Sequence, residues 1–83
     1  MTKDQFMKIL RKLQQYQQMA VGETIDFKVV TYRYRDDAAS IDFMINKGES
    51  YLRSGTIHEC DEYKQTCERV KGLADYLKTN KWI

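Results

Sequence analysis

Few side chains in this sequence are of a type that does covalent chemistry or binds a metal ion. There is one histidine, His58, and there are two cysteines, Cys60 and Cys67. Acidic residues follow His58 within 59–62, so a general-base role can be imagined for its imidazole. The sequence offers no nucleophile at a recognisable spacing, no glycine-rich phosphate loop and no paired-carboxylate motif. We therefore expect a solvated histidine and a protein that is not an enzyme.

The two cysteines lie seven residues apart, in a segment whose pattern predicts a helix. At about 1.5 Å per residue their Cα atoms would be about 10 Å apart, beyond the limit of about 7 Å for a disulfide. A shared zinc ion is disfavoured as well, because two sulfurs on one tetrahedral zinc lie about 4 Å apart. We expect two small buried thiols, with no metal and no other cofactor.

The composition predicts one small folded domain that spans residues 1–83. At 9.9 kDa, folding removes only about 60% of the chain's surface from water, so the core is small. A hydrophobic fraction of 42% and the absence of proline exclude a disordered tail or a proline-rich linker. The formal charge of +2 gives no strong global attraction to nucleic acid or anionic lipid. No signal sequence or apolar run of about 20 residues is present, so we expect a cytoplasmic location and no membrane partner.

The N-terminal residues predict an amphipathic helix over about residues 3–19. Thr2 and Gln5 have the spacing of a capping box, and Gly22 is expected to end the helix. The apolar residues recur at three- and four-residue steps, at Phe6, Ile9, Leu10, Leu13, Tyr16 and Ala20. The opposite face is the only coherent basic surface, with Lys8, Arg11 and Lys12.

Residues 24–35 predict a β-strand, because β-branched and aromatic residues alternate along it. The alternation changes phase at Val29 and Val30, which is typical of a bulge or of a strand covered on both faces.

The end of this strand also has the residue types of a nucleic-acid platform. One face would hold Tyr32 and Tyr34, and the other Arg33 and Arg35. Two aspartates follow at once and no RNP-like motif is present, so we expect packed tyrosines and solvated arginines instead.

The segment from 36 to 55 fits two structures. Ile41, Phe43 and Ile45 alternate as in a strand, which would make residues 36–39 a hairpin turn. A helical stripe also runs through Ile41, Ile45, Gly48 and Leu52. In that structure Asp36 or Asp37 is the N-cap, Gly48 permits a close helix crossing and Gly55 ends the helix. We favour the helix because its stripe is longer, although Phe43 would then point outward.

A second capping-box pattern, Thr56 with Glu59, predicts the start of the last helix. Its apolar seam has regular spacing, at Cys60, Tyr63, Cys67, Val70, Ala74 and Leu77. The predicted fold is therefore α+β and mainly α, with an N-terminal helix, one long strand (or a hairpin) and a C-terminal αα-hairpin. A single strand leaves its backbone groups unpaired, so it needs a hairpin partner or another chain; if residues 40–46 are helical, we expect it to pair with another subunit or protein.

About forty C-terminal residues contain a leucine–glycine turn, an acidic–tyrosine pair and a glycine–leucine pair, at Leu52, Gly55, Glu62, Tyr63, Gly72 and Leu73. This pattern resembles small uncharacterised proteins of tailed phages and prophages. It implies an αα-hairpin, a phage origin and a non-enzymatic role in virion assembly, in the host cytoplasm or in the virion.

We expect protein–protein contacts with a second copy, as a homo-oligomer, or with another phage or host protein. Trp82 and Ile83 must either fold back onto the core or enter a neighbour. The candidate interface residues are Tyr32, Tyr34, Arg69, Gly72, Tyr76, Trp82 and Ile83. A phage-encoded inhibitor of a host enzyme or defence nuclease is the alternative function. A second alternative is a weak nucleic-acid-binding regulator that uses Lys8, Arg11, Lys12, Arg33 and Arg35.

Overall fold

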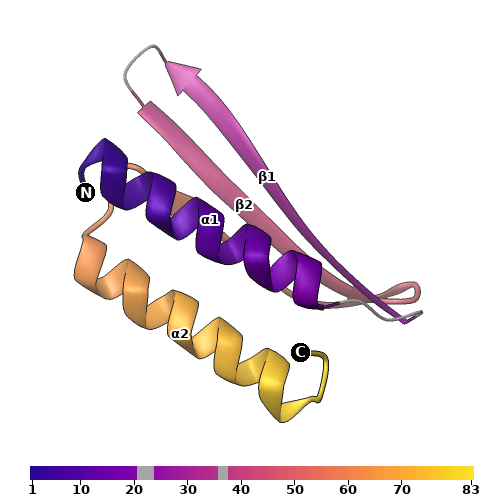
Figure 1. The fold of residues 1–83 in the computed structure, drawn as a ribbon. Coiled ribbons are helices and arrows are strands. Elements are labelled where there is room, and N and C mark those ends of the chain that lie inside the picture. Colours follow the sequence, from indigo (N-terminus) through magenta and orange to yellow (C-terminus); the bar gives the residue numbers. More distant parts are fainter. Residues whose placement is uncertain (21–23, 36–37) are drawn as a thin grey trace.

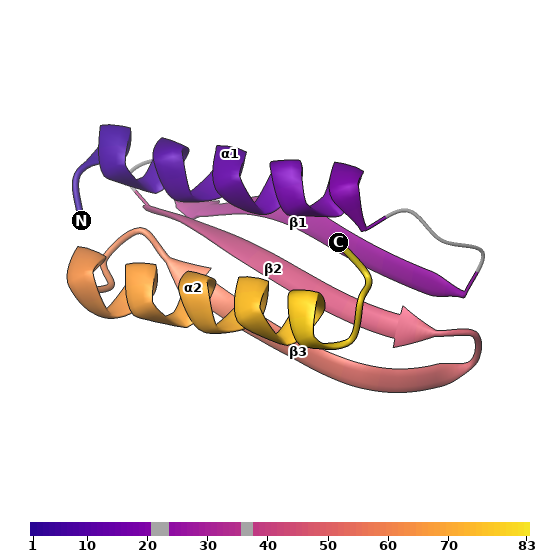
Figure 2. The same ribbon diagram turned by 60° about the horizontal axis from the view of Figure 1, so that its bottom comes forward.

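The structure is a computed structural model that describes the chain except residues 21–23 and 36–37 and the side chains of 33–35 and 38. Three strands form one antiparallel sheet in the order β1-β2-β3, and two helices cover one of its faces, running in the same direction (Figures 1 and 2). The elements along the chain are α1 (Lys3–Met19), β1 (Ile25–Arg35), β2 (Ala38–Lys47), β3 (Ser50–His58) and α2 (Tyr63–Thr79).

The prediction of a mainly α fold with a C-terminal αα-hairpin is wrong, because residues 40–46 lie in β2 and not in a helix. Ile41 and Ile45 fit both periodicities, so they could not decide between them. A helix would have pointed Phe43 outward, whereas in the sheet this residue is partly buried. Its ring packs edge-on against Phe27, with ring centroids 6.4 Å apart. Leu52 and Gly55 lie in β3, so the helical hairpin implied by the phage resemblance is absent from the described residues.

The prediction for α1 is confirmed, bounds included. Both bonds of the capping box are present: Gln5 N–H donates to Thr2 Oγ1 at 3.2 Å, and Thr2 N–H donates to Gln5 Oε1 at 2.9 Å. Gly22, expected to end this helix, lies outside the described residues.

The core lies between the sheet and the two helices. Alternate residues of the strands point toward the helices, and both helices turn an apolar stripe toward the sheet. The buried apolar side chains are Phe6, Ile9, Leu10, Leu13, Ala20, Ile25, Phe27, Ile41, Ile45, Ile57, Val70, Leu73, Ala74 and Leu77.

Gly48, which was expected inside a helix, belongs to the hairpin of β2 and β3. Gly48 lies in the two-residue turn between Lys47 and Ser50 and has φ of +60°, a conformation that glycine adopts without steric cost. Its predicted role at a helix crossing is therefore wrong. A bulge follows, because Ile45 pairs with Arg53 while Asn46 pairs with Tyr51.

The second capping box is wrong as well. Thr56 lies in β3, where its Oγ1 donates to Asp42 Oδ1 at 2.8 Å, an interaction across the sheet. The last helix begins only at Tyr63, and its N-cap residue Glu62 makes no side-chain capping bond. The capping-box spacing is present in the sequence, but the residues up to His58 pair with β2 as a strand and so cannot begin a helix.

The expectation that the predicted strand needs another chain to pair with also fails, because β1 pairs with β2 along its length. The C-terminal residues fold back onto the core of their own chain. Trp82 N–H donates to Leu77 O at 2.9 Å, and the indole packs edge-on against Tyr76 with centroids 5.8 Å apart. No helix among the described residues is long and apolar enough to cross a membrane.

Candidate functional site

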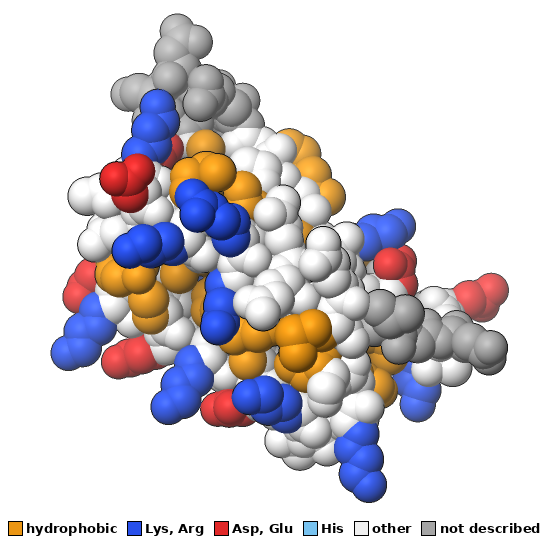
Figure 3. Space-filling view, in the orientation of Figure 1, with side chains coloured by type: hydrophobic (Ala, Val, Ile, Leu, Met, Phe, Trp, Pro, Cys, Tyr) orange, Lys and Arg blue, Asp and Glu red, His pale blue; other side chains and the backbone are white. Residues whose placement is uncertain are grey.

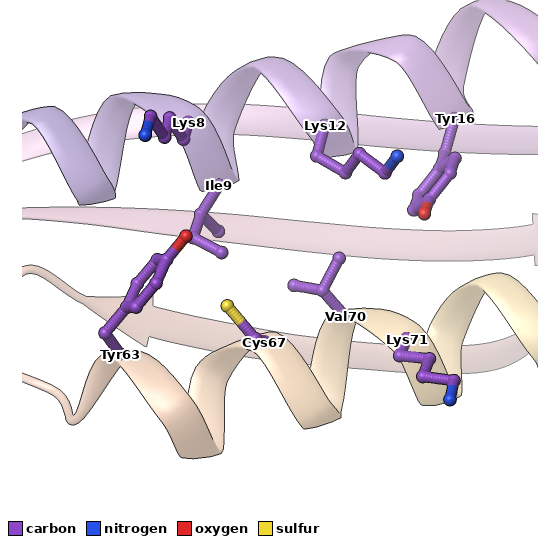
Figure 4. Close-up of a pocket in the computed structure, with 8 residues that line it drawn as sticks. All are labelled: Lys8, Ile9, Lys12, Tyr16, Tyr63, Cys67, Val70 and Lys71. Carbon is purple, nitrogen blue, oxygen red and sulfur yellow. The ribbon is translucent and has the colours of Figure 1, made fainter.

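A groove with a volume of about 430 Å³ runs between α1 and α2 (Figure 4). Each helix contributes a row of residues four positions apart, which places the members of a row on one helix face. The row on α1 is Lys8, Lys12 and Tyr16, with Ile9 beside it; the row on α2 is Tyr63, Cys67 and Lys71, with Val70 beside it.

The groove has an apolar floor and a polar rim. Ile9 and Val70 are buried at its base. Tyr63 lies near one end and Tyr16 near the other, because one is in the first turn of α2 and the other in the last turn of α1 (Figure 4). The ammonium group of Lys12 lies 5.6 Å from the centroid of the Tyr16 ring, a cation–π distance.

The rim is positively charged, since Lys8, Lys12 and Lys71 line the groove and no carboxylate does. The rest of the helical layer is basic too: α1 has four basic residues and one acidic residue, and α2 has four and two. Figure 3 shows these basic side chains distributed over the helices. Three acidic residues lie instead within 59–62, in the connection from β3 to α2. The groove therefore suits an anionic ligand with apolar groups.

Tyr63 and Cys67 lie one helical turn apart in the groove, and Cys67 affects the pKa of Tyr63. The pKa of Tyr63 is raised above its ordinary value, first by its hydrogen bond with Cys67, then by the negative charge of the Cys67 thiolate, and last by burial. A tyrosine of ordinary pKa is already neutral near neutral pH, and the raised pKa keeps the Tyr63 phenol neutral to a higher pH.

The two cysteines differ in their surroundings. Cys67 is partly buried in α2, whereas Cys60 is exposed in the connection before that helix, so the prediction of two buried thiols is wrong for Cys60. The cause is the later start of α2, which leaves Cys60 outside the apolar seam. Among the described residues, no group of three histidine, cysteine, aspartate or glutamate side chains is arranged to hold a metal ion.

A second surface is the face of the sheet that the helices leave uncovered, here called the open face. Even-numbered residues of β1 and β2 point to it, as the bond between Thr56 and Asp42 shows. A shallow hollow of about 230 Å³ lies on it, lined in part by Val30, Tyr32 and Met44.

The residues predicted as an interface lie apart. Arg69 donates to Thr56 O at 3.1 Å, and Tyr76 packs between Trp82 and Arg53, whose guanidinium carbon lies 5.0 Å from the Tyr76 ring centroid. These contacts engage that side of α2 with its own chain. Ile83 packs against the core, whereas Gly72 is exposed with no atom near it.

Of the other predicted residues, Tyr32 lies on the open face, where its side chain is 44% exposed. The backbone of Arg33, Tyr34 and Arg35 belongs to β1, but their side chains lie outside the described part of the chain. Lys8 and Lys12 line the groove, and Arg11 is exposed on α1.

The sequence interpretation missed Tyr16, Tyr63 and Lys71 as parts of one site. The signal that was available is the repeated spacing of four in both helices, but only the parallel placement of the helices brings the two rows together. Comparisons of the chain with models of protein families, with curated proteins and with solved structures find no match.

Proposed function

We propose that this protein is a non-enzymatic binding module that holds an acidic segment of a partner protein in the groove between α1 and α2. The observation that supports this function is the groove lining, in which three lysines surround an apolar floor without a carboxylate. Both protein-binding roles expected from the sequence, assembly and inhibition, belong to this class.

The geometry suits an amphipathic helix as the bound segment. The row from Lys8 to Tyr16 spans about 12 Å at about 1.5 Å per residue, which matches about two turns of a helix lying along the groove. Apolar side chains of the segment would cover Ile9 and Val70, and its carboxylates would face the lysines. Exposed ion pairs contribute only about 0.2–1 kcal/mol each, so the lysines select the ligand while apolar burial supplies most of the affinity.

Nucleic acid fits this surface less well, because acidic residues interrupt it. Glu68 lies beside Lys64 and Lys71 on the flank of the groove, and the acidic residues within 59–62 precede the first turn of α2. A long polyanion that leaves the groove in this direction would meet these carboxylates, whereas a short acidic segment would not.

The test uses a fluorescently labelled peptide with leucines on one helical face and glutamates on the other, and a charge-reversed peptide with lysines. By anisotropy, the acidic peptide should bind and the basic one should not. Lys12→Glu and Lys71→Glu should each weaken binding about tenfold or more. Lys78→Glu is the matched control, because it makes the same charge change on α2 outside the groove lining, and it should change affinity less than about threefold.

Three results would contradict the proposal, given thermal unfolding curves that show each variant folded. One is equal affinity for both peptides, and another is an equal loss for Lys71→Glu and Lys78→Glu. The third is displacement of the acidic peptide by a single-stranded oligonucleotide that binds more tightly and with a steeper salt dependence, which would favour a nucleic-acid function.

A further inference from the structure

We infer that the open face of the sheet is a self-association surface, on which a second copy of the chain packs as a weak two-fold dimer. Both helices lie on the other face, so no described element covers this one (Figures 1 and 2). The large hydrophobic side chains exposed here are four of the six found in the described residues: Val30, Tyr32, Met44 and Tyr51.

Apolar and polar side chains alternate on the open face: Met44 lies between Lys28 and Ser54, and Val30 lies beside Asp42. Val30 and Met44 lie on neighbouring strands beside the hollow and are 44% and 45% exposed. Lys28, Asp42 and Thr56 line the same hollow. A solvated face of an antiparallel sheet ordinarily presents polar side chains, whereas this one exposes large apolar side chains among them, and exposed apolar surface is typical of a protein contact.

Charge indicates that the occupant is a second copy. The described charged side chains of the open face are Asp26, Lys28 and Asp42, and Lys28 already lies 3.4 Å from Asp26. A two-fold contact places the same patch of both copies face to face, so a patch with a large net charge would repel its copy. The charges of this patch nearly balance, so two copies can meet here. The charges of the helical layer do not balance, and its excess of basic residues repels a second copy. Two copies therefore meet sheet to sheet.

The area available sets the strength of this contact. Eleven residues of β1 at about 3.4 Å each span about 37 Å, in agreement with the longest dimension of the molecule, 37 Å. Three strands with their side chains cover a width of about 15 Å, so each copy buries about 500 Å² and the pair about 1,000 Å². Specific interfaces begin near this size, so the dimer should form only at high concentration.

In such a dimer both grooves stay open, because each helical layer faces outward. If the proposed function is correct, one dimer holds two acidic segments, and a partner with two such segments gains affinity through effective concentration. The self-association itself does not depend on the groove and is tested without any ligand.

Sedimentation velocity over a concentration series measures the dimer. The average mass should rise from that of the monomer toward twice that value between about 10 µM and about 1 mM. Met44→Lys should hold the chain monomeric throughout this range, because it removes an exposed apolar side chain from the central strand and adds a positive charge beside Lys28 on both open faces. Met19→Lys is the matched control, since Met19 on α1 is 49% exposed and away from the open face, and it should dimerise like the parent chain.

Tyr51→Ser is a second test of the dimer, in case Met44→Lys fails to fold. Tyr51 is 62% exposed and adds little to the core, so its replacement should leave the fold intact. It should weaken dimerisation at least threefold. Concentration-dependent amide shifts in NMR spectra should map to β1, β2 and β3 and spare the helices. A monomer at all concentrations, equal effects of the two methionine variants, shifts on the helices, or growth beyond a dimer would each overturn the inference.

Discussion

The ring of Phe43 occupies the space where a side chain at Gly55 would begin. A β-carbon built on Gly55 would lie 2.6 Å from Cζ of Phe43 and 2.8 Å from its Cε1, far inside van der Waals contact. The two residues are cross-strand partners in β2 and β3, and the missing side chain lets the ring lie flat enough to pack edge-on against Phe27. A glycine that the sequence suggested as a helix end is thus a packing requirement of the sheet.

Gly55→Ala should therefore destabilise the protein by about 1–3 kcal/mol, because Phe43 must leave its position against Phe27. Thermal unfolding should show the transition lowered by about 4–8 °C for each kcal/mol, as expected for a chain of this length. The control is the same substitution in a Phe43→Leu background, where the shorter side chain leaves room for the methyl group. If the loss is as large there as in the parent chain, the contact between these two residues is not its cause.

Gly72→Ala should have the opposite sign. Gly72 lies inside α2, exposed, with no atom within 4 Å of the position of a β-carbon. Alanine there should raise the free energy of unfolding by about 0.5–1 kcal/mol, because glycine loses more backbone entropy in a helix. Urea denaturation measures the difference. Gly48→Ala is the contrast, because φ of +60° in its turn should make that variant less stable by about 1 kcal/mol.

The Tyr63 phenol should titrate at a higher pH than an ordinary tyrosine. Its pKa is raised by the hydrogen bond with Cys67, by the charge of the thiolate and by burial. A pKa that is higher in the folded than in the unfolded chain adds stability below the unfolded value of about 10, and this stability is lost as pH rises through the folded pKa. The ultraviolet absorbance of phenolate measures the titration. Tyr63→Phe should remove a late-titrating group, and Cys67→Ala should move that group toward the ordinary range; unchanged curves for both variants would exclude the pairing.

Thiol labelling should distinguish the two cysteines and report on the groove. Cys60 is exposed and Cys67 is partly buried in the groove, so Cys60 should react faster with a thiol reagent. Saturation with the acidic peptide should slow the labelling of Cys67 about tenfold and leave Cys60 unchanged, as read by mass spectrometry of proteolytic fragments. Equal protection of both thiols would indicate a general stabilisation, and no protection of Cys67 would place the peptide elsewhere.

Local sequence patterns were sufficient for α1, for β1 and for the apolar side of α2, but not for the start of α2. The capping box at Thr2 and the apolar stripe that follows describe α1 fully, because helical hydrogen bonds and side-chain neighbours are close in sequence. The same holds for β1, whose alternation predicted a strand over nearly the bounds observed. The apolar spacing from Tyr63 onward likewise corresponds to the buried side of α2.

Residues 40–58 could not be assigned in this way. Ile41 and Ile45 are four positions apart, a spacing that places both residues on the same face of a strand and also on the same face of a helix. Either structure would therefore bury them. The decision came from partners distant in sequence: β2 is the central strand and pairs on one side with β1 and on the other with β3. Once both edges are paired, the capping pattern at Thr56 cannot begin a helix.

The sequence by itself therefore determined α1 with its basic face, the apolar side of α2 and the first strand, and it determined that residues of the types used in catalysis and metal binding are scarce. Only the tertiary structure decided which surfaces exist. Lys12 and Lys71 are 59 positions apart, and they line one groove because the three-stranded sheet returns the chain so that α2 lies beside α1 in the same direction. Val30 and Met44 line one hollow on the same face only because β1 and β2 pair in this register. Helical periodicity is local, whereas strand pairing and helix packing depend on contacts between distant residues, and both candidate surfaces arise from those contacts.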